Sequence, residues 1–183
     1  MKAIKIILGI ITALILAFFL TGLVVQEVVY TNEVIVNKPV PEVFEDFQNV
    51  SLMKKWMPDL ESIETIEELP NKLGSTYKVV VENKGKPITM TQKILEYEHN
   101  ERIALGYDAE NMLKTDDYVF TAEGNNTKIL QTSICTSESY VMSCLFPYFK
   151  GALKKMSQQY LDQFKKVSEA HTKTPTIDKS ELP

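Results

Sequence analysis

The sequence predicts an α+β fold, in which six to seven mostly antiparallel strands form one curved sheet against a long C-terminal helix, preceded by one N-terminal transmembrane helix. Three observations predict it. The first 25 residues are almost wholly apolar, strand-like segments separated by short polar turns fill the middle of the chain, and apolar residues at helical spacing fill its C-terminal part. Strands that run in succession and then give way to a helix are typical of α+β domains.

The composition excludes several classes of protein. The chain has 183 residues, 44% of them hydrophobic, with 7 Gly and 8 Pro, so it is neither disordered as a whole nor collagen-like. Beyond residue 25 it carries 18 basic and 24 acidic side chains, a net charge of −6. Because nucleic-acid affinity depends on Lys and Arg neutralising phosphates, we expect no nucleic-acid partner.

Residues 1–25 are interpreted as a membrane anchor. Ile6–Val25 contains 20 consecutive residues without a charge, which as a helix span about 30 Å, the thickness of the bilayer's hydrocarbon core. The alternative is a cleaved signal peptide, whose apolar stretch usually has only about 7–15 residues. Leu20-Thr21-Gly22 is a weak candidate cleavage site. The length of the run favours a retained anchor.

The flanking charges indicate the orientation of this anchor. Lys2 and Lys5 precede the apolar run, whereas the first basic residue after it is Lys38. Positive residues tend to stay on the cytoplasmic side. We therefore expect a single-pass membrane protein with its N-terminus in the cytoplasm and its C-terminal domain outside it.

Residues 26–169 have the size of one domain, and residues 170–183 have the composition of a disordered tail. The two cysteines, Cys135 and Cys144, are too few for a disulfide scaffold and form either one bridge or two buried thiols. Neither they nor the two histidines have the spacing of a metal site. We expect no metal and no cofactor.

The domain opens with a strand and two short helices. Val28–Val36 is rich in β-branched residues and predicts a strand. After it, apolar residues at positions 40, 43, 44 and 47 share one face of a helix. Ser51 is the expected cap of a second short helix, SLMKKWM, which Pro58 ends.

The middle of the chain consists of predicted strands. They are Ser62–Ile66, Thr76–Glu82, Ile88–Tyr97, Arg102–Tyr107, Leu113–Ala122 and Thr127–Ser137. The four residues 123–126, Glu-Gly-Asn-Asn, have the composition of a hairpin turn between the last two. Such short connections join antiparallel neighbours.

The last element is a long amphipathic helix. Its apolar residues recur at spacings of three and four: Met142, Phe146, Phe149, Leu153, Met156, Tyr160, Phe164 and Val167. Proline is favoured in a first helical turn, so we expect the helix to begin near Pro147.

This order of elements resembles the helix-grip fold of the START-like (SRPBCC) superfamily. Three segments carry the resemblance: EVIVNKPVPEVFEDFQNVSLMKKWMPDLESIE, ILEYEHNERIALGY and the helix end FKKVSE. It covers nearly all of residues 28–169. The superfamily includes polyketide cyclase/dehydrase-like and lipid-transfer members, so the resemblance implies an elongated cavity for lipids, polyketides, sterols or similar hydrophobic ligands.

A cavity is also physically reasonable, because one helix cannot cover a curved sheet completely. The candidate ligand-binding residues are Trp56, Tyr77, Met90, Gln92, Tyr97, Tyr107, Tyr118, Phe149, Met156 and Tyr160. Met adapts to irregular ligands, and Tyr offers an apolar body with a polar tip. The alternative for each residue is an ordinary place in the core.

Little in the sequence points to catalysis. It has no Gly-rich phosphate loop and no GxSxG, CxxC or HExxH pattern. Asp116 and Asp117 are strand neighbours that face opposite ways, so we interpret them as solvated surface charge. Gln131 and Ser133 fall on the inner face, where they need hydrogen-bond partners.

The leading hypothesis is a membrane-anchored binding module for a hydrophobic small molecule or lipid. A cyclase- or dehydratase-like enzyme is the second, since such proteins can work with few charged groups, and no catalytic residue is assigned. The third is an envelope protein that presents its surface to another protein. The residues identify neither that protein nor the ligand.

Overall fold

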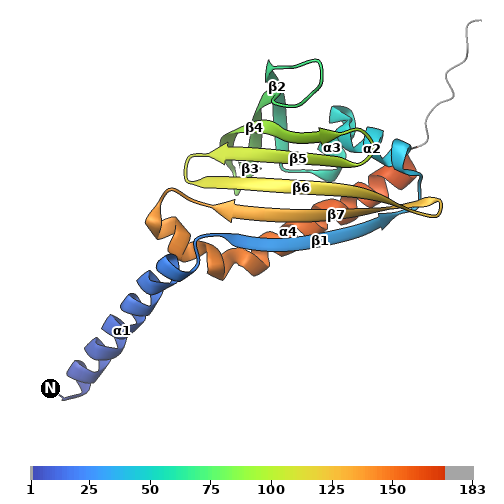
Figure 1. Cartoon of the computed structure of the whole chain (residues 1–183). Helices are drawn as coiled ribbons and strands as arrows, with labels where there is room; N and C mark the ends of the chain where they lie inside the picture. Colours follow the sequence, from blue (N-terminus) through green and yellow to red (C-terminus); the bar gives the residue numbers. More distant parts are fainter. Residues whose placement is uncertain (1, 172–183) are drawn as a thin grey trace, which may run out of the picture.

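The computed structural model describes residues 2–171 (Figure 1). Its elements are α1 (Lys2–Val24), β1 (Val28–Val36), α2 (Val40–Gln48), α3 (Val50–Trp56), β2 (Leu60–Glu67), β3 (Thr76–Asn83), β4 (Lys86–Glu98), β5 (Arg102–Ala109), β6 (Met112–Glu123), β7 (Asn126–Thr136) and α4 (Tyr140–Ala170). The strands form one sheet in the order β1-β7-β6-β5-β4-β3-β2. Every neighbouring pair is antiparallel. The predicted α+β class, antiparallel sheet of six to seven strands and long C-terminal helix are confirmed.

The predicted strands are all present, with bounds that differ by at most two residues. The hairpin turn predicted at residues 123–126 is also confirmed, because Glu123 pairs with Asn126 across β6 and β7. Gly124 lies at the tip with φ of 65°, a left-handed conformation that glycine adopts without steric cost.

The helix α4 packs along β1 on the inner face of the sheet, and the residues of β1 alternate strictly between buried and exposed. The end of the sheet away from α1, called the distal end here, is closed by α2 and α3 (Figure 1). There Phe47 stacks on Trp56 with ring centroids 5.5 Å apart, and Phe164 of α4 packs edge-on against both rings. This aromatic cluster fills the distal half of the space between α4 and the sheet.

The start of α4 differs from the prediction. The helix begins at Tyr140, two turns before Pro147, so the proline is inside the helix and not in its first turn. A proline there removes one backbone hydrogen bond and strains the preceding turn. Contacts between this early part of α4 and the end of α1 compensate, and the sequence pattern of α4 alone gives no sign of them.

The cap of α3 also differs from the prediction. Asn49, not Ser51, caps this helix, because its side-chain oxygen accepts hydrogen bonds from the backbone N–H groups of Ser51 and Leu52 at 2.9 and 3.4 Å. Asn and Ser are comparably good caps. The helix begins one residue earlier than expected, at Val50.

The C-terminal end of α4 is held by a buried carboxylate. Asp46 of α2 accepts hydrogen bonds from Ser168 Oγ at 2.7 Å and Lys38 Nζ at 3.1 Å, and its other oxygen lies 2.7 Å from His171 Nδ1. Ala170 and His171 are therefore ordered, although both belong to the expected tail. The rest of that tail, residues 172–183, lies outside the described residues.

Candidate ligand-binding site

The inner face of the sheet can be followed strand by strand from the register. One row of paired residues crosses six strands: Val28, Cys135, Lys114, Tyr107, Gln92 and Tyr77. Paired residues on antiparallel strands point to the same face. Because Val28 is buried beneath α4, the whole row faces inward. The row lies near the start of β1, four residues after the end of α1.

Burial decreases along this row. Val28 and Cys135, on β1 and β7, are buried, whereas Lys114, Tyr107, Gln92 and Tyr77 keep part of their surface exposed. In the next rows towards α1, Met90, Ile88 and Val81 are also only half-buried, whereas Val79, which pairs with Met90, is buried. Here α4 lies along β1 and beside β7, and its core residues Leu161 and Phe164 lie further along the helix, towards the distal end. At this end of the sheet the inner face of β3–β6 is therefore incompletely covered.

One side of α4 borders this incompletely covered area. Phe149, Met156 and Tyr160 are spaced by seven and four residues, so they share one side of the helix. The Tyr160 hydroxyl lies 2.8 Å from Asp59, just before β2, which turns this side towards the β2 edge of the sheet. Phe149 and Met156 are 51% and 40% exposed. Neither side chain is packed tightly against the strands.

A buried ion pair lies on the inner face beside this area. Lys114 Nζ is 2.7 Å from Asp116, which also accepts a 2.6 Å hydrogen bond from Ser133. Burial disfavours the charge on Lys114, but the Asp116 carboxylate outweighs it and raises the pKa of the ammonium above its ordinary value. Burial, and then the charge of Asp116, raises the pKa of the Tyr107 phenol, which therefore stays protonated.

The expectation that Asp116 is surface charge is wrong. Asp116 is 3% exposed, because it alternates with Lys114 and Tyr118 on the inward side of β6. Its neighbour Asp117 faces outward and pairs with Arg102 at 2.8 Å. Lys114 is not among the residues predicted from the sequence. The period-two pattern of β6 was the available signal, since it places residues 114, 116, 118 and 120 on one face.

Further polar groups lie deeper on the same face. Gln131 donates a 3.2 Å hydrogen bond to the Tyr118 hydroxyl, and Asn32 donates to Lys154 O and Gln158 Oε1. Among the described residues, the carbonyl oxygens of both amides are buried and without a partner. A buried polar atom without a hydrogen bond is costly, and its usual explanation is a bound water or ligand group. Both oxygens are hydrogen-bond acceptors, so the missing partner of each is a donor.

The ten predicted site residues are divided between this area and the core. Tyr77, Met90, Gln92 and Tyr107 lie on adjacent strands of the incompletely covered face, and Phe149, Met156 and Tyr160 border it from α4. The other three are Trp56 and Tyr118, which belong to the core cluster, and Tyr97, which packs against it. Tyr77, Tyr107 and Tyr160 also pack against that cluster, so they lie at the boundary between the core and this area. Trp56 and Tyr118 contact the ring of Phe47, and Tyr97 contacts that of Phe44.

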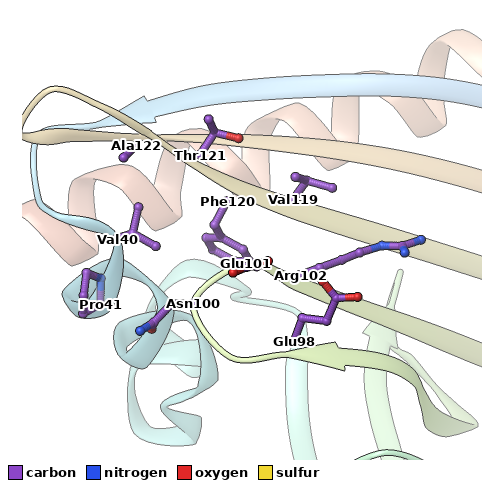
Figure 2. A pocket seen from close by; sticks show the side chains of 10 residues that line it. All are labelled: Val40, Pro41, Glu98, Asn100, Glu101, Arg102, Val119, Phe120, Thr121 and Ala122. Carbon is purple, nitrogen blue, oxygen red and sulfur yellow. The ribbon is translucent and has the colours of Figure 1, made fainter.

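Two hollows lie elsewhere, at the distal end. The first has a volume of about 550 Å³ and lies between the start of α2, the turn at Asn100 and the end of β6 around Thr121 (Figure 2). The second, of about 490 Å³, lies between α2 and His99. Both are open surface depressions, and none of the ten predicted residues lines either one. No side chain that lines them has a buried polar atom without a hydrogen-bond partner, so neither hollow offers a ligand a buried polar contact of that kind.

The potential for metal or thiol chemistry is limited in the part of the chain that the structure describes. Within residues 2–171 no group of three His, Cys, Asp or Glu side chains is arranged to hold a metal ion. Cys135 and Cys144 are buried, unbridged thiols. Burial is the main cause that raises the pKa of Cys135, so this thiol is not activated as a nucleophile.

Comparison with known proteins finds similar structures but no protein with a similar sequence. No family model matches the sequence, and no curated protein matches it. TTHA0849 from Thermus thermophilus has a similar structure, with a TM-score of 0.65 at 14% identity over 78% of this chain and 97% of its own. Ara h 8.0201 gives a TM-score of 0.63 at 16% identity over 79% and 99%.

The Zhui aromatase/cyclase from Streptomyces sp. R1128 is a third example. Its TM-score is 0.60 at 14% identity, over 77% of this chain and 96% of its own. In each case the similarity extends over nearly the whole of the other protein. The chain therefore has the helix-grip fold that these proteins share, with an apolar N-terminal helix in front of it.

Proposed function

We propose that this protein is a membrane-anchored binding module for a hydrophobic small molecule or lipid, held between α4 and the incompletely covered inner face of β3–β6. The observation that carries the proposal is the half-buried state of Met90, Gln92 and Tyr107 beside the buried Lys114–Asp116 pair. An apolar recess with a few polar groups is the usual form of a small-molecule site. The likeness to an aromatase/cyclase supports an organic ligand.

The contacts of the ligand follow from this placement. Its apolar part lies against Tyr77 and Met90 of the sheet and against Phe149 and Met156 of α4. Its polar end reaches the Lys114 region deeper on the inner face. Trp56, Tyr97 and Tyr118 support the distal wall through core packing and do not themselves contact the ligand.

The anchoring part of the proposal rests on α1. It is the one helix of residues 2–171 that is long and apolar enough to cross a membrane, and it lies at the N-terminus, where signal peptides also occur. Gly22 and Thr21 of α1 contact Cys144 of α4, and a cleaved signal peptide has no reason to pack against the mature domain. We propose that the anchor is retained, with residues 26–169 as the domain outside the cytoplasm. Anchoring keeps the recess near the bilayer, where such ligands concentrate.

A cyclase- or dehydratase-like activity is the second candidate. The observation in its favour is the Tyr107 ring, whose centroid lies 6.0 Å from the Lys114 ammonium in the half-buried part of the site. A protonated phenol beside a positive charge can polarise a ligand carbonyl. This activity requires that Tyr107→Phe abolishes turnover while ligand binding persists.

The test compares two variants on one strand. Met90 faces the recess, and its neighbour Thr91 faces outward and is exposed. The full-length protein and its Met90→Trp and Thr91→Trp variants are purified in mild detergent, extracted with organic solvent and analysed by mass spectrometry. We expect a ligand recovered from the wild type and from Thr91→Trp, and about tenfold less of it from Met90→Trp. Equal recovery from all three proteins means that the extracted molecules only surround α1, and it contradicts the proposal.

A further inference from the structure

The first ten residues of α4, Tyr140–Phe149, have an unusual composition and exposure. The segment reads YVMSCLFPYF and contains no charged residue, although Glu138 precedes it closely and Lys150 follows it. Phe146 is buried, but four of its large side chains are not: Tyr140, Val141, Tyr148 and Phe149 are between 43% and 62% exposed. A cluster of exposed aromatic and aliphatic residues on a soluble domain usually marks a contact with a membrane or another protein.

This segment is joined to the end of α1. Phe18 stacks on Tyr148 with ring centroids 6.1 Å apart, and Phe19 stacks on Tyr140 at 6.2 Å. The Tyr140 hydroxyl donates to the backbone carbonyl of Phe19, and a Cβ at Gly22 would clash with Cys144 Sγ. The last two turns of α1 and the first turns of α4 thus form one continuous apolar surface.

The position of the joint along α1 determines its depth in a bilayer. Phe18 lies six residues before Val24, the end of α1, which corresponds to about 9 Å along the helix axis. If α1 spans the membrane and ends at its surface, a ring stacked on Phe18 lies near the boundary of head groups and acyl chains. Tyrosine is enriched at that depth, because its body is apolar and its hydroxyl is polar.

We propose that Tyr140–Phe149 is a second membrane-contacting segment, which lies in the lipid interface beside α1. The proposal rests on the anchoring part of the proposed function and not on ligand binding. It assigns a role to the early start of α4. Two fixed contacts, α1 and this segment, then hold the recess end of the sheet against the bilayer, whereas a single flexible tether would leave it free to turn.

Quenching by brominated lipid tests the proposal in the full-length protein. The native Trp56 is buried near the distal end and serves as a constant background. Tyr148→Trp places an indole in the proposed segment, and Val141→Trp provides a second exposed position should the first variant fold poorly. Ile66→Trp is the control, at an exposed position of β2 on the opposite edge of the sheet. All are reconstituted in vesicles of phosphatidylcholine brominated in the upper acyl chain, and flotation verifies anchoring.

We expect the added fluorescence of Tyr148→Trp and Val141→Trp to be largely lost in brominated vesicles, and that of Ile66→Trp to be unchanged. If the vesicles float with the protein and neither segment variant is quenched, the second contact does not exist, while the anchor stands. If the segment is unquenched and cross-links two copies of the chain, the second membrane contact is likewise contradicted, and the surface is a dimer interface. Protein that fails to float contradicts both the anchor and the second contact.

Discussion

The Lys114 ammonium lies 2.7 Å from the Asp116 carboxylate on the inner face of β6, beside the least covered part of the sheet. Asp116 is buried, and Ser133 provides its second hydrogen bond. Removing one member of a buried pair leaves an uncompensated charge, whereas removing both can be nearly neutral. This pair is therefore expected to matter both for stability and for the polarity of the recess.

We expect Asp116→Ala to lower the free energy of unfolding by about 3 kcal/mol, and the double variant Lys114→Met/Asp116→Leu to lose less than that. The buried Trp56 is the chain's one tryptophan, so its fluorescence in a denaturant titration reports unfolding. Asp117→Ala is the matched control: it breaks a pair with Arg102 on the outer face, and exposed pairs contribute at most about 1 kcal/mol. Equal losses for Asp116→Ala and Asp117→Ala would show that the inner pair is not buried.

The Asp46 carboxylate predicts a pH dependence of stability. Burial raises its pKa, but the hydrogen bonds from Ser168, His171 and Lys38 outweigh burial and leave the pKa below its ordinary value. A carboxyl with a lowered folded-state pKa stabilises the protein above the unfolded-state pKa of about 3.9, and this contribution is lost as the pH falls further.

We therefore expect unfolding to become easier below about pH 4, with a weaker pH dependence and a lower neutral stability in Asp46→Asn. Thermal melts between neutral and acidic pH measure this. Asp108→Asn, at an exposed position of β5, provides the control and should follow the wild type. If Asp46→Asn loses stability with acid as steeply as the wild type does, another group is responsible.

The close approach of α1 to α4 depends on the missing side chain of Gly22. A Cβ there would overlap Cys144 Sγ, whereas a Cβ at Gly9, on the same helix, would meet nothing within 4 Å. We expect Gly22→Val to separate the two helices and expose the Cys144 thiol, so that it reacts faster with N-ethylmaleimide. Gly9→Val should leave the rate unchanged. An unchanged rate in Gly22→Val would show that α1 does not dock on α4.

The unpartnered oxygens of Gln131 and Asn32 predict the polarity of the ligand. Both atoms need hydrogen-bond donors, and the Lys114 ammonium on the same face is already neutralised by Asp116. A hydroxyl group can donate to these oxygens, whereas a carboxylate cannot. We expect a long-chain alcohol to bind about tenfold more tightly than the fatty acid of equal length.

Native mass spectrometry of the full-length protein with each lipid measures this preference. Gln131→Met removes one of the two oxygens at similar volume and should reduce it, whereas Thr132→Val, on the outer face of the same strand, should not. Equal affinity of the alcohol and the acid would indicate that a buried water satisfies these oxygens.

The sequence was sufficient for the sheet because its signals there are local. The alternation in Val28–Val36 and the turn residues at 123–126 determine faces and connections without reference to distant residues. The start of α4 was mispredicted for the opposite reason. Pro147 is a local signal for a helix start. The early start depends instead on contacts of Tyr148 with Phe18 and of Cys144 with Gly22, and the residues of each pair are more than 100 positions apart in the sequence.

For the candidate site, the sequence could indicate shared faces, and the assignment of these residues to a ligand stays a prediction. The period-two pattern places Tyr77, Gln92 and Tyr107 on one face, and the register brings them side by side. The pattern alone cannot tell an uncovered position from a core position on that face. Trp56 and Tyr118 went to the core because both rings pack on Phe47, a contact that depends on where α2 and α3 dock.

Thiol labelling tests most directly whether the inner face of β3–β6 is open at the end of the sheet near α1. A Met90→Cys variant places a thiol on that face, and the native Cys135, buried on the same face beneath α4, is the internal reference. Labelling of the folded protein with a small maleimide, followed by mass spectrometry of its peptides, gives both rates in one sample. We predict that the thiol at position 90 reacts at least about tenfold faster than Cys135 and becomes protected when a hydrophobic ligand binds. If the two thiols react equally slowly, the space between α4 and the sheet is filled, and the protein does not carry a ligand there.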